Sequence, residues 1–335
     1  MIKTTTCGKL YLAGEYAILN PNQVAIIKDI PIYMTAQVTP SEHYSLSSDM
    51  FNYSVDLTDD ANYALIQESI KTMANYLELK GKVLTPFSLK INGKMEKEGK
   101  KIGIGSSGSV TVLTLKALAL FYQLHLTKEE LFKLAVYTLL KKGDNGSMGD
   151  IACIVYESLI YYRSFDRQRV KKWLLEVTLE ELLEKDWGFT IKPVKTNLSF
   201  TFLVGWTRQP AISSQMIKKV QASIDNHFLS TSKKEVNHLY KALETGDKAK
   251  TKESISLLSQ LLETLHPSIY SPKLKKLKNA THQLDAVAKS SGAGGGDSGI
   301  ALVFDEESTL ELIKRWQKEN ITVLYQEKMR GFHDK

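Results

Sequence analysis

Gly103-Ile104-Gly105-Ser106-Ser107-Gly108-Ser109 stands directly before an apolar helical pattern that begins near Val110. Glycine lets a backbone approach a ligand closely and adopt positive φ. Free N–H groups at the start of a helix, together with the positive end of its dipole, form a site for an anion such as a polyphosphate. The serine hydroxyls offer further ligands for phosphate oxygens or for a magnesium ion. The stretch therefore predicts a phosphate-binding loop followed by a helix.

Two other glycine-rich phosphate-binding motifs have to be distinguished from this stretch. It satisfies G-x-G-x-x-G, the dinucleotide fingerprint, which needs a strand running into the loop and an acid closing a second strand about 20 residues later. Here the lysine-rich segment 93–101 precedes the loop, and a second helical pattern follows the first. The P-loop pattern G-x-x-x-x-G-K-[ST] occurs nowhere in the sequence. A plain glycine-rich turn that opens a helix remains as the structural alternative.

A second glycine-rich segment is Lys289-Ser290-Ser291-Gly292-Ala293-Gly294-Gly295-Gly296-Asp297-Ser298-Gly299. It lies between a helical pattern and the strand-like run 300–304. Glycines in this density cost conformational entropy that a simple turn does not require. We interpret them as a place where the backbone approaches a ligand, with a flexible linker as the alternative.

The third segment is Cys7-Gly8-Lys9-Leu10-Tyr11-Leu12-Ala13-Gly14-Glu15-Tyr16-Ala17-Ile18-Leu19, a predicted strand that ends in a Gly-Glu turn. A lysine at the start of a strand is, by itself, more often a surface residue than a catalytic one. On its own, the segment assigns Lys9 no chemistry.

Length and composition predict a globular protein with two domains. The chain has 335 residues, 43% of them apolar and 24% charged, and a domain typically has about 150 residues. Strand-like and helical runs are mixed without strict alternation, which favours α+β domains. The charge-laced helical stretch 167–185 ends before a strand-rich segment, so we place the boundary at residue 187, giving domains 1–187 and 188–335.

Periodicity predicts the individual elements. The strand-like runs are 10–12, 24–27, 87–91, 200–206, 300–304 and 321–325. The helical patterns are 63–77, 110–122, 128–140, 236–243, 253–265, 274–288 and 308–316.

The formal net charge of +7 would suit a nucleotide, a nucleic acid or a membrane surface equally well. The lysines are scattered among acids, so we expect neither nucleic acid nor membrane as a partner. The longest apolar stretch, Val110 to Leu120, is shorter than the roughly 20 residues that span a bilayer. The N-terminus lacks the features of a signal peptide. We therefore expect a cytoplasmic protein in which Cys7 and Cys153 are reduced core thiols.

In this order and with these spacings, the three segments resemble the signature motifs of the GHMP kinase superfamily, and the resemblance covers nearly the whole chain. Together with Gly143-Asp144-Asn145-Gly146-Ser147-Met148-Gly149-Asp150, they are most similar to bacterial phosphomevalonate kinases. The resemblance implies a two-domain α+β fold, with an N-terminal ribosomal-S5-domain-2-like domain, a C-terminal ferredoxin-like domain and the active site in the cleft between them. It also implies ATP, Mg²⁺ and phosphomevalonate as ligands.

The resemblance implies a role for each matching residue. Lys9 and Asp150 match the lysine and aspartate that face the acceptor and the γ-phosphate, the loop 103–109 matches the phosphate loop, and Ser107 matches its magnesium-binding serine. An acceptor with a phosphate and a carboxylate needs several donors. The residues that we nominate for its pocket are Tyr16, Lys101, Ser147, Ser213, Ser291, Gly292 and Ala293.

Two departures from the superfamily pattern affect the function. Mevalonate kinases have a magnesium-binding glutamate about a dozen residues before the catalytic aspartate, whereas this chain has Tyr137-Thr138-Leu139-Leu140, so the second metal ligand is left open. Tyr16 follows Gly14-Glu15 where galactokinases carry histidine, which argues against a sugar acceptor. The alternatives are a mevalonate kinase, another small-molecule kinase of the superfamily, and a metabolite-sensing regulator without turnover. The homologous diphosphomevalonate decarboxylase lacks the lysine that Lys9 matches.

Overall fold

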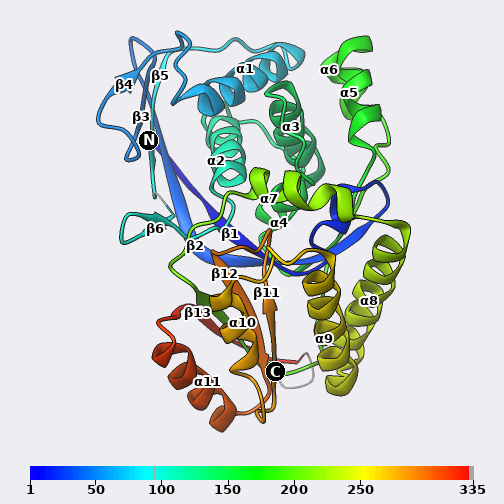
Figure 1. The fold of residues 1–335 in the computed structure, drawn as a ribbon. Helices are drawn as coiled ribbons and strands as arrows, with labels where there is room; N and C mark the ends of the chain where they lie inside the picture. Colours follow the sequence, from blue (N-terminus) through cyan, green and yellow to red (C-terminus); the bar gives the residue numbers. More distant parts are fainter. Residues whose placement is uncertain (94, 332–335) are drawn as a thin grey trace.

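Two long strands near the N-terminus, β1 (Ile2–Ala13) and β2 (Val24–Pro40), form the centre of the first sheet (Figure 1). The structure is a computed structural model that describes residues 1–93 and 95–331. The sheet has seven strands in the order β4-β3-β5-β2-β8-β9, and β1 pairs with β2. The other strands are β3 (Ser45–Ser48), β4 (Ser54–Val55), β5 (Phe87–Asn92), β8 (Ile160–Arg163) and β9 (Thr190–Pro193). The pair β3 and β5 is parallel, and the other pairs are antiparallel.

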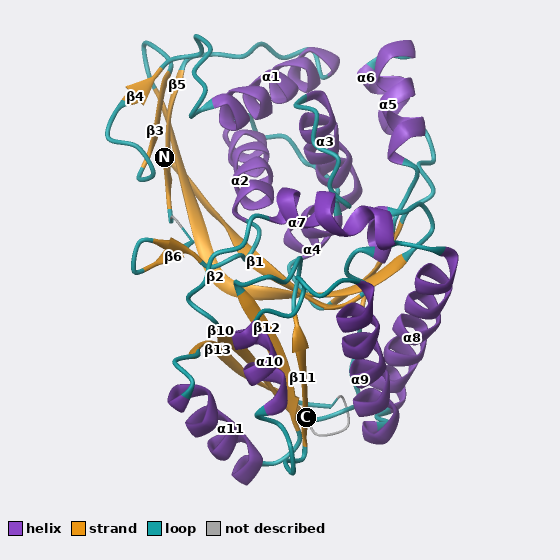
Figure 2. Ribbon diagram, in the orientation of Figure 1, coloured by secondary structure: helices purple, strands orange, loops and turns teal. Residues whose placement is uncertain are grey.

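Helices gather on one side of this sheet (Figure 2). They are α1 (Ala64–Leu79), α2 (Ser106–Phe121), α3 (Lys128–Lys141) and α4 (Gly149–Tyr156), with α5 (Arg167–Glu176) and α6 (Leu179–Glu184) beside them. A short hairpin of β6 (Glu96–Lys97) and β7 (Lys100–Lys101) precedes α2. The predicted helices at 63–77, 110–122 and 128–140 are confirmed as α1, α2 and α3.

The second sheet contains β10 (Phe200–Trp206), β11 (Ala286–Ser290), β12 (Ser298–Val303) and β13 (Thr322–Met329) in the order β11-β12-β10-β13. Helices connect β10 to β11 and β12 to β13. They are α7 (Ser213–Val220), α8 (Asn226–Thr245), α9 (Lys248–Leu265), α10 (Pro272–Asn279) and α11 (Glu306–Lys318). This order and connectivity, β-α-β-β-α-β, is that of a ferredoxin-like domain. The predicted two-domain α+β fold is therefore confirmed.

One predicted helix, 274–288, is wrong in its second half. α10 ends at Asn279, and residues 286–290 form the buried strand β11, paired with β12. A short apolar run does not by itself distinguish a buried strand from a helix segment. Here residues 286–290 form a strand because β12 is available to pair with them.

The second sheet is buried on both faces, because its side chains alternate between two hydrophobic clusters. Phe202 of β10 packs with the core of the first domain, whereas its neighbour Leu203 packs with Leu312 and Trp316 of α11. Val236 and Leu239 of α8 also join the first core. The first of these clusters therefore extends as one continuous apolar core through both domains.

The change from the first sheet to the second falls after the predicted boundary at residue 187. β9 follows that position and still pairs with β8, and Trp187 is completely buried in the core of the first domain. The next strand, β10, belongs to the second sheet. The division at 187 stays a prediction, and the strand pairing favours a boundary between Pro193 and Phe200.

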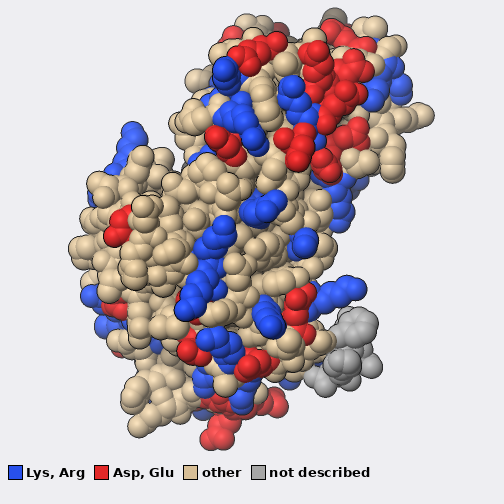
Figure 3. All heavy atoms as spheres, turned by 90° about the vertical axis from the view of Figure 1, so that its right-hand side faces the viewer, with Lys and Arg blue, Asp and Glu red and all other residues tan. Residues whose placement is uncertain are grey.

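On the face drawn in Figure 3, acidic side chains gather at the top, lysines and arginines prevail across the middle, and both signs mix near the bottom. No basic field covers the whole of that face, in keeping with the scattered lysines of the sequence. Among the described residues, no helix is both long and apolar enough to span a membrane. Both cysteines are free and buried, and burial raises the pKa of the Cys7 thiol to about 12.

A buried ion pair ties the two domains together. The Lys289 ammonium, at the end of β11, donates to the Glu15 carboxylate that follows β1 and to the Ser290 carbonyl at 2.6 Å. Lys289 is 0% exposed and Glu15 is 4% exposed. Burial lowers the pKa of Lys289, and the Glu15 carboxylate opposes that shift. Removing one partner would leave the other as an uncompensated charge in the interior.

We predict that Glu15→Gln or Lys289→Met will each lower the free energy of unfolding by about 3–5 kcal/mol, the usual cost of breaking a buried pair. The double variant Glu15→Met/Lys289→Met should lose less than either single variant, because it leaves no buried charge. Urea unfolding followed by circular dichroism measures all three. Single variants that unfold at the wild-type urea concentration would show that the pair does not hold the domains together.

Candidate active site

A cavity of about 180 Å³ lies where the two domains meet. Most of the residues predicted for the site line it, and they come from elements far apart in the sequence. The predicted residues in its wall are Lys9, Tyr16, Gly103, Ser147, Asp150, Ser213, Ser291, Gly292 and Ala293. The long chain segments between the motifs therefore bring one set of polar groups to a single place.

Lys9 on β1 lies against the phosphate loop. Its N–H donates to the Ile104 carbonyl at 2.9 Å. A Cβ atom on Gly105 would lie 2.8 Å from the Cε atom of Lys9, and Gly105 has φ +87°. The Lys9 ammonium also stands 5.1 Å from the centre of the Tyr11 ring. A side chain at position 105 would thus push the Lys9 side chain aside, and the backbone conformation itself also favours glycine.

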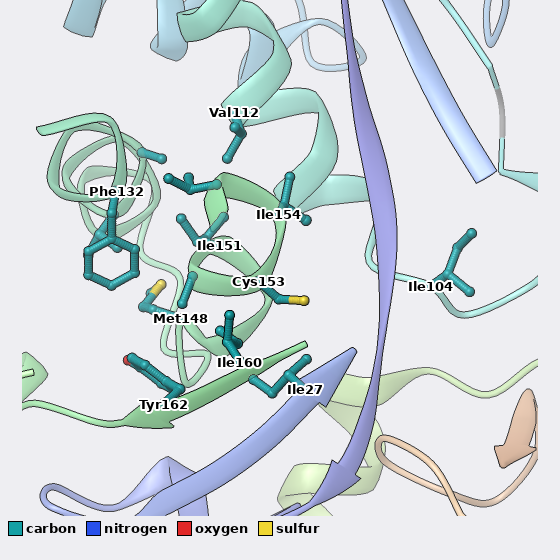
Figure 4. Close-up of a cluster of buried hydrophobic side chains, with 14 of the residues drawn as sticks. Ile27, Ile104, Val112, Phe132, Met148, Ile151, Cys153, Ile154, Ile160 and Tyr162 are labelled. Atoms are coloured by element: carbon teal, nitrogen blue, oxygen red, sulfur yellow. The ribbon is translucent and has the colours of Figure 1, made fainter. Parts of the chain in front are cut away.

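Asp150 lies in the first turn of α4, a short helix anchored by its apolar residues. Ile151 and Ile154 point into the core beside Val112 of α2 and Phe132 of α3 (Figure 4). This packing leaves Asp150 at the cavity, where its Oδ1 atom accepts from the Ile151 N–H at 3.0 Å. A Cβ atom on Gly108 would come within 3.1 Å of the Asp150 Oδ2 atom. The carboxylate therefore faces α2 directly after the phosphate loop.

Two buried tyrosines hold Ser147 just ahead of Asp150. The hydroxyls of Tyr11 and Ser147 are 2.9 Å apart, and the Tyr162 hydroxyl donates to the Ser147 carbonyl at 2.9 Å. The Gly149 N–H donates to the Ser147 hydroxyl at 3.2 Å. Burial, assisted by the Asp150 carboxylate, raises the pKa of Tyr11 well above its usual value. Tyr11 is therefore a neutral hydroxyl that positions Ser147.

The second domain closes the cavity with the turn that contains Ser291, Gly292 and Ala293. The Tyr16 hydroxyl donates to the Ala293 carbonyl at 2.5 Å, and the Ser291 hydroxyl donates to the Tyr11 carbonyl at 2.8 Å. A Cβ atom on Gly292 would meet nothing within 4 Å. Each of these contacts joins the two domains at the cavity wall.

Other glycines of the second glycine-rich segment pack against protein rather than facing the cavity. A Cβ atom would lie 2.4 Å from the Ile269 carbonyl oxygen at Gly294 and 2.3 Å from the Gln209 carbonyl oxygen at Gly296. That this segment approaches a ligand therefore stays a prediction for Gly292, which lines the cavity. Close backbone packing explains Gly294 and Gly296.

The remaining predicted residues are placed around the start of α2. Ser106 is half-buried and Ser107 is exposed in its first turn, where the N–H groups have no partner within the helix. Ser109 is completely buried, and its hydroxyl donates to the Cys7 carbonyl at 2.9 Å. It thus lies apart from the cavity and ties α2 to β1. The side chain of Lys101 lies outside the described part of the chain.

Sequence reasoning missed Tyr11, Glu15 and Asp297, which also line the cavity. Tyr11 had a signal, because side chains two apart on a strand share a face and Lys9 was already a candidate. The sequence also held a signal for Asp297, because it is the acid that ends the run of glycines. Its Oδ1 atom accepts from the Ala211 N–H at 3.1 Å, and a Cβ atom on Gly103 would lie 2.5 Å from its Oδ2 atom. Asp297 therefore joins the phosphate loop to the chain that leads into α7.

The site has few ligands of its own for a metal ion. Among the described residues, no group of three or more His, Cys, Asp or Glu side chains is placed to hold one. Mg²⁺ is usually bound through one or two protein groups together with substrate phosphates. An exposed Ser107 side chain beside the first free N–H groups of α2 fits that mode of binding.

Comparison with known proteins gives consistent matches over most of the chain. The family models for the GHMP kinases N-terminal domain and the GHMP kinases C-terminal region match residues 64–158 and 239–322. A structure of Streptococcus pneumoniae phosphomevalonate kinase in complex with phosphomevalonate and AMPPNP is 54% identical, covers 98% of this chain and 100% of that one, and has a TM-score of 0.97.

Two curated relatives are more distant. A phosphomevalonate kinase of Streptomyces sp. (strain CL190) is 29% identical, with 95% of this chain and 94% of the relative covered. A mevalonate kinase of Methanocaldococcus jannaschii is 26% identical, with 95% and 96% covered.

The contact between Gly105 and Lys9 gives a prediction. Gly105→Ala should lower phosphoryl-transfer turnover by on the order of 10²-fold, because displacing a reacting group by about 1 Å has that effect. Gly81→Ala is the matched control, since Gly81 has φ +66° but would meet nothing within 4 Å. Turnover and melting temperature are measured for both variants. Equal turnover in the two would mean that Gly105 is required for backbone conformation alone.

Proposed function

This chain belongs to the GHMP kinases, and on that basis we propose that it transfers the γ-phosphate of ATP to 5-phosphomevalonate, giving 5-diphosphomevalonate and ADP. The observation that carries the proposal is the convergence of Lys9, Asp150 and Ser147 with the turn 291–293 around one cavity beside the start of α2. A protein 54% identical over almost the whole chain binds phosphomevalonate and AMPPNP. A cytoplasmic location stays a prediction.

The start of α2 supports binding of the nucleotide phosphates. Phosphoryl transfer depends mainly on positioning and on stabilisation of charge in the transition state. The free N–H groups of Ser106 and Ser107, at the positive end of a long helix, suit a polyphosphate. Ser107 would hold Mg²⁺, which when bound neutralises charge on the phosphates.

Lys9 lies against Gly105 and Asp150 against Gly108, and both residues line the cavity. The backbone of Lys9 is fixed to the loop through Ile104, and Asp150 faces Gly108. We assign to the Lys9 ammonium the neutralisation of charge between the acceptor and the γ-phosphate. We assign to Asp150 the orientation of Lys9 and of the acceptor.

The acceptor determines whether Asp150 must also remove a proton. A phosphate monoester has a second pKa near 6, so it is mostly dianionic and already nucleophilic at neutral pH. An alcohol acceptor, by contrast, needs a base. For phosphomevalonate, an orienting Asp150 is sufficient.

Mevalonate is the second candidate acceptor, because a mevalonate kinase is among the relatives of this chain. We predict that phosphomevalonate will be the best acceptor in a panel of mevalonate, phosphomevalonate, homoserine and galactose. The measurement is ADP release by the purified protein with magnesium-ATP. A higher rate with mevalonate would contradict the assigned acceptor while leaving the family membership intact.

We predict that Lys9→Met and Asp150→Asn will each lower turnover by about 10²-fold or more, with a smaller effect on acceptor binding. The residual rate of Asp150→Asn should still rise with pH through about 6, since the acceptor phosphate ionises without help. The measurement is a pH–rate series at saturating magnesium-ATP.

Lys3→Met is the matched control, because Lys3 lies on the same strand as Lys9 and is exposed. Near-wild-type turnover of either site variant would remove that residue from the proposed mechanism. Loss of the rising limb in Asp150→Asn alone would instead make Asp150 an obligate base.

A further inference from the structure

A second hollow adjoins the active-site cavity. It has a volume of about 560 Å³, and it shares Leu19 and Ile217 with the active-site cavity as wall residues. Beyond them its wall is mixed: Asn145, Asp166, Arg167 and Gln168 are polar or charged, and Pro21 and Ile224 are apolar. Leu19 and Ile217 thus lie between the active-site cavity and this second hollow.

Arg167, the first residue of α5, stands at this junction. Its Nη2 atom donates to the Leu19 carbonyl. Its Nη1 atom is buried and has no hydrogen-bond partner among the described residues. Among the residues that the structure describes, no carboxylate oxygen lies within 4.0 Å of its guanidinium group, the distance that defines an ion pair. One edge of the guanidinium group is therefore fixed in place while a buried donor remains unused.

The nearest acids have other partners. Asp166 caps α5 through the N–H groups of Gln168 and Arg169, at 2.9 and 3.1 Å. The Asp144 Oδ1 atom accepts from the Gly146 N–H at 2.5 Å. Burial lowers the pKa of Arg167 despite both carboxylates. An arginine stays protonated in proteins, so the buried Nη1 donor, which no described residue accepts from, suits an anionic ligand.

The position of Arg167 matches one end of the acceptor. Lys9 and Asp150, taken as the reacting end, line only the active-site cavity, whereas Leu19 and Ile217 line both that cavity and the hollow that Arg167 lines. Phosphomevalonate carries its phosphate and its carboxylate at opposite ends of a short chain. With the phosphate at the reacting end, the carboxylate is directed toward Arg167.

We infer that Arg167 binds the carboxylate of the acceptor and thereby selects for a carboxylic acid. The inference rests on the proposed function. A planar guanidinium group suits a carboxylate, because both present paired atoms in one plane. The hydroxyls of Ser147 and Ser291, which already have partners, contact the middle of the acceptor. The nucleotide lies on the other side, at α2, so Arg167 does not contact it.

The test compares two acceptors, phosphomevalonate and its analogue with a primary amide in place of the carboxylate. Arg167→Gln should raise KM for phosphomevalonate by about 10- to 100-fold, the range of a charged hydrogen bond. KM for ATP should not change. The wild type should prefer the acid over the amide, and Arg167→Gln should lose that preference. Arg167→Lys, which keeps the charge without the planar fork, should retain part of it.

Arg169→Gln is the matched control. Arg169 lies on the same helix and also donates to a backbone carbonyl, that of Trp187, at 2.9 Å. It should keep the wild-type preference. If Arg167→Gln loses the same factor with both acceptors, Arg167 only holds Leu19 in place and the inference is overturned, with the proposed function intact. A wild type that does not use phosphomevalonate would overturn both.

If Arg167→Gln does not fold, the wild type and Arg167→Lys still decide the question. An equal KM for acid and amide in the wild type would overturn the inference. An acid preference that weakens in Arg167→Lys would support it.

Discussion

The site depends on a constraint of space, namely that the phosphate loop must lie directly against the side chains that act on its ligand. At Gly105 and Gly108 a Cβ atom would meet Lys9 and Asp150, at 2.8 and 3.1 Å. Glycine in this loop therefore serves the catalytic side chains as well as the phosphates. Because β1 and α4 are both fixed in the core, any side chain added to the loop would have to displace a functional group.

Close contacts at the cavity also join the two domains. No flexible linker separates them, and the contacts at the cavity are polar and direct, from Ser291 to Tyr11 and from Tyr16 to Ala293. The buried Glu15 carboxylate belongs both to the cavity wall and to the bond between the domains. Stability and site geometry are therefore carried by the same few contacts.

The sequence predicted those parts of the site that local patterns encode. Glycines before an apolar helix indicated the phosphate loop, and Lys9 and Asp150 followed from the resemblance to a family. Glu15 was missed because its partner is 274 residues away, and no local pattern records such a pairing. Arg167 was missed because the helix that carries it reads as a solvated, charge-rich element. Strand β11 was read as helix because only β12 makes it a strand.

The continuous core has a consequence for how the chain is made. Apolar residues of α8 and of the second sheet, such as Val236 and Phe202, pack into the core of the first domain. On a ribosome, residues before Phe200 emerge first, so part of that core stays exposed to water until the second half follows. Such surfaces bind chaperones or aggregate. This protein therefore gains little from synthesis domain by domain, and its yield in a cell depends on completing the chain quickly.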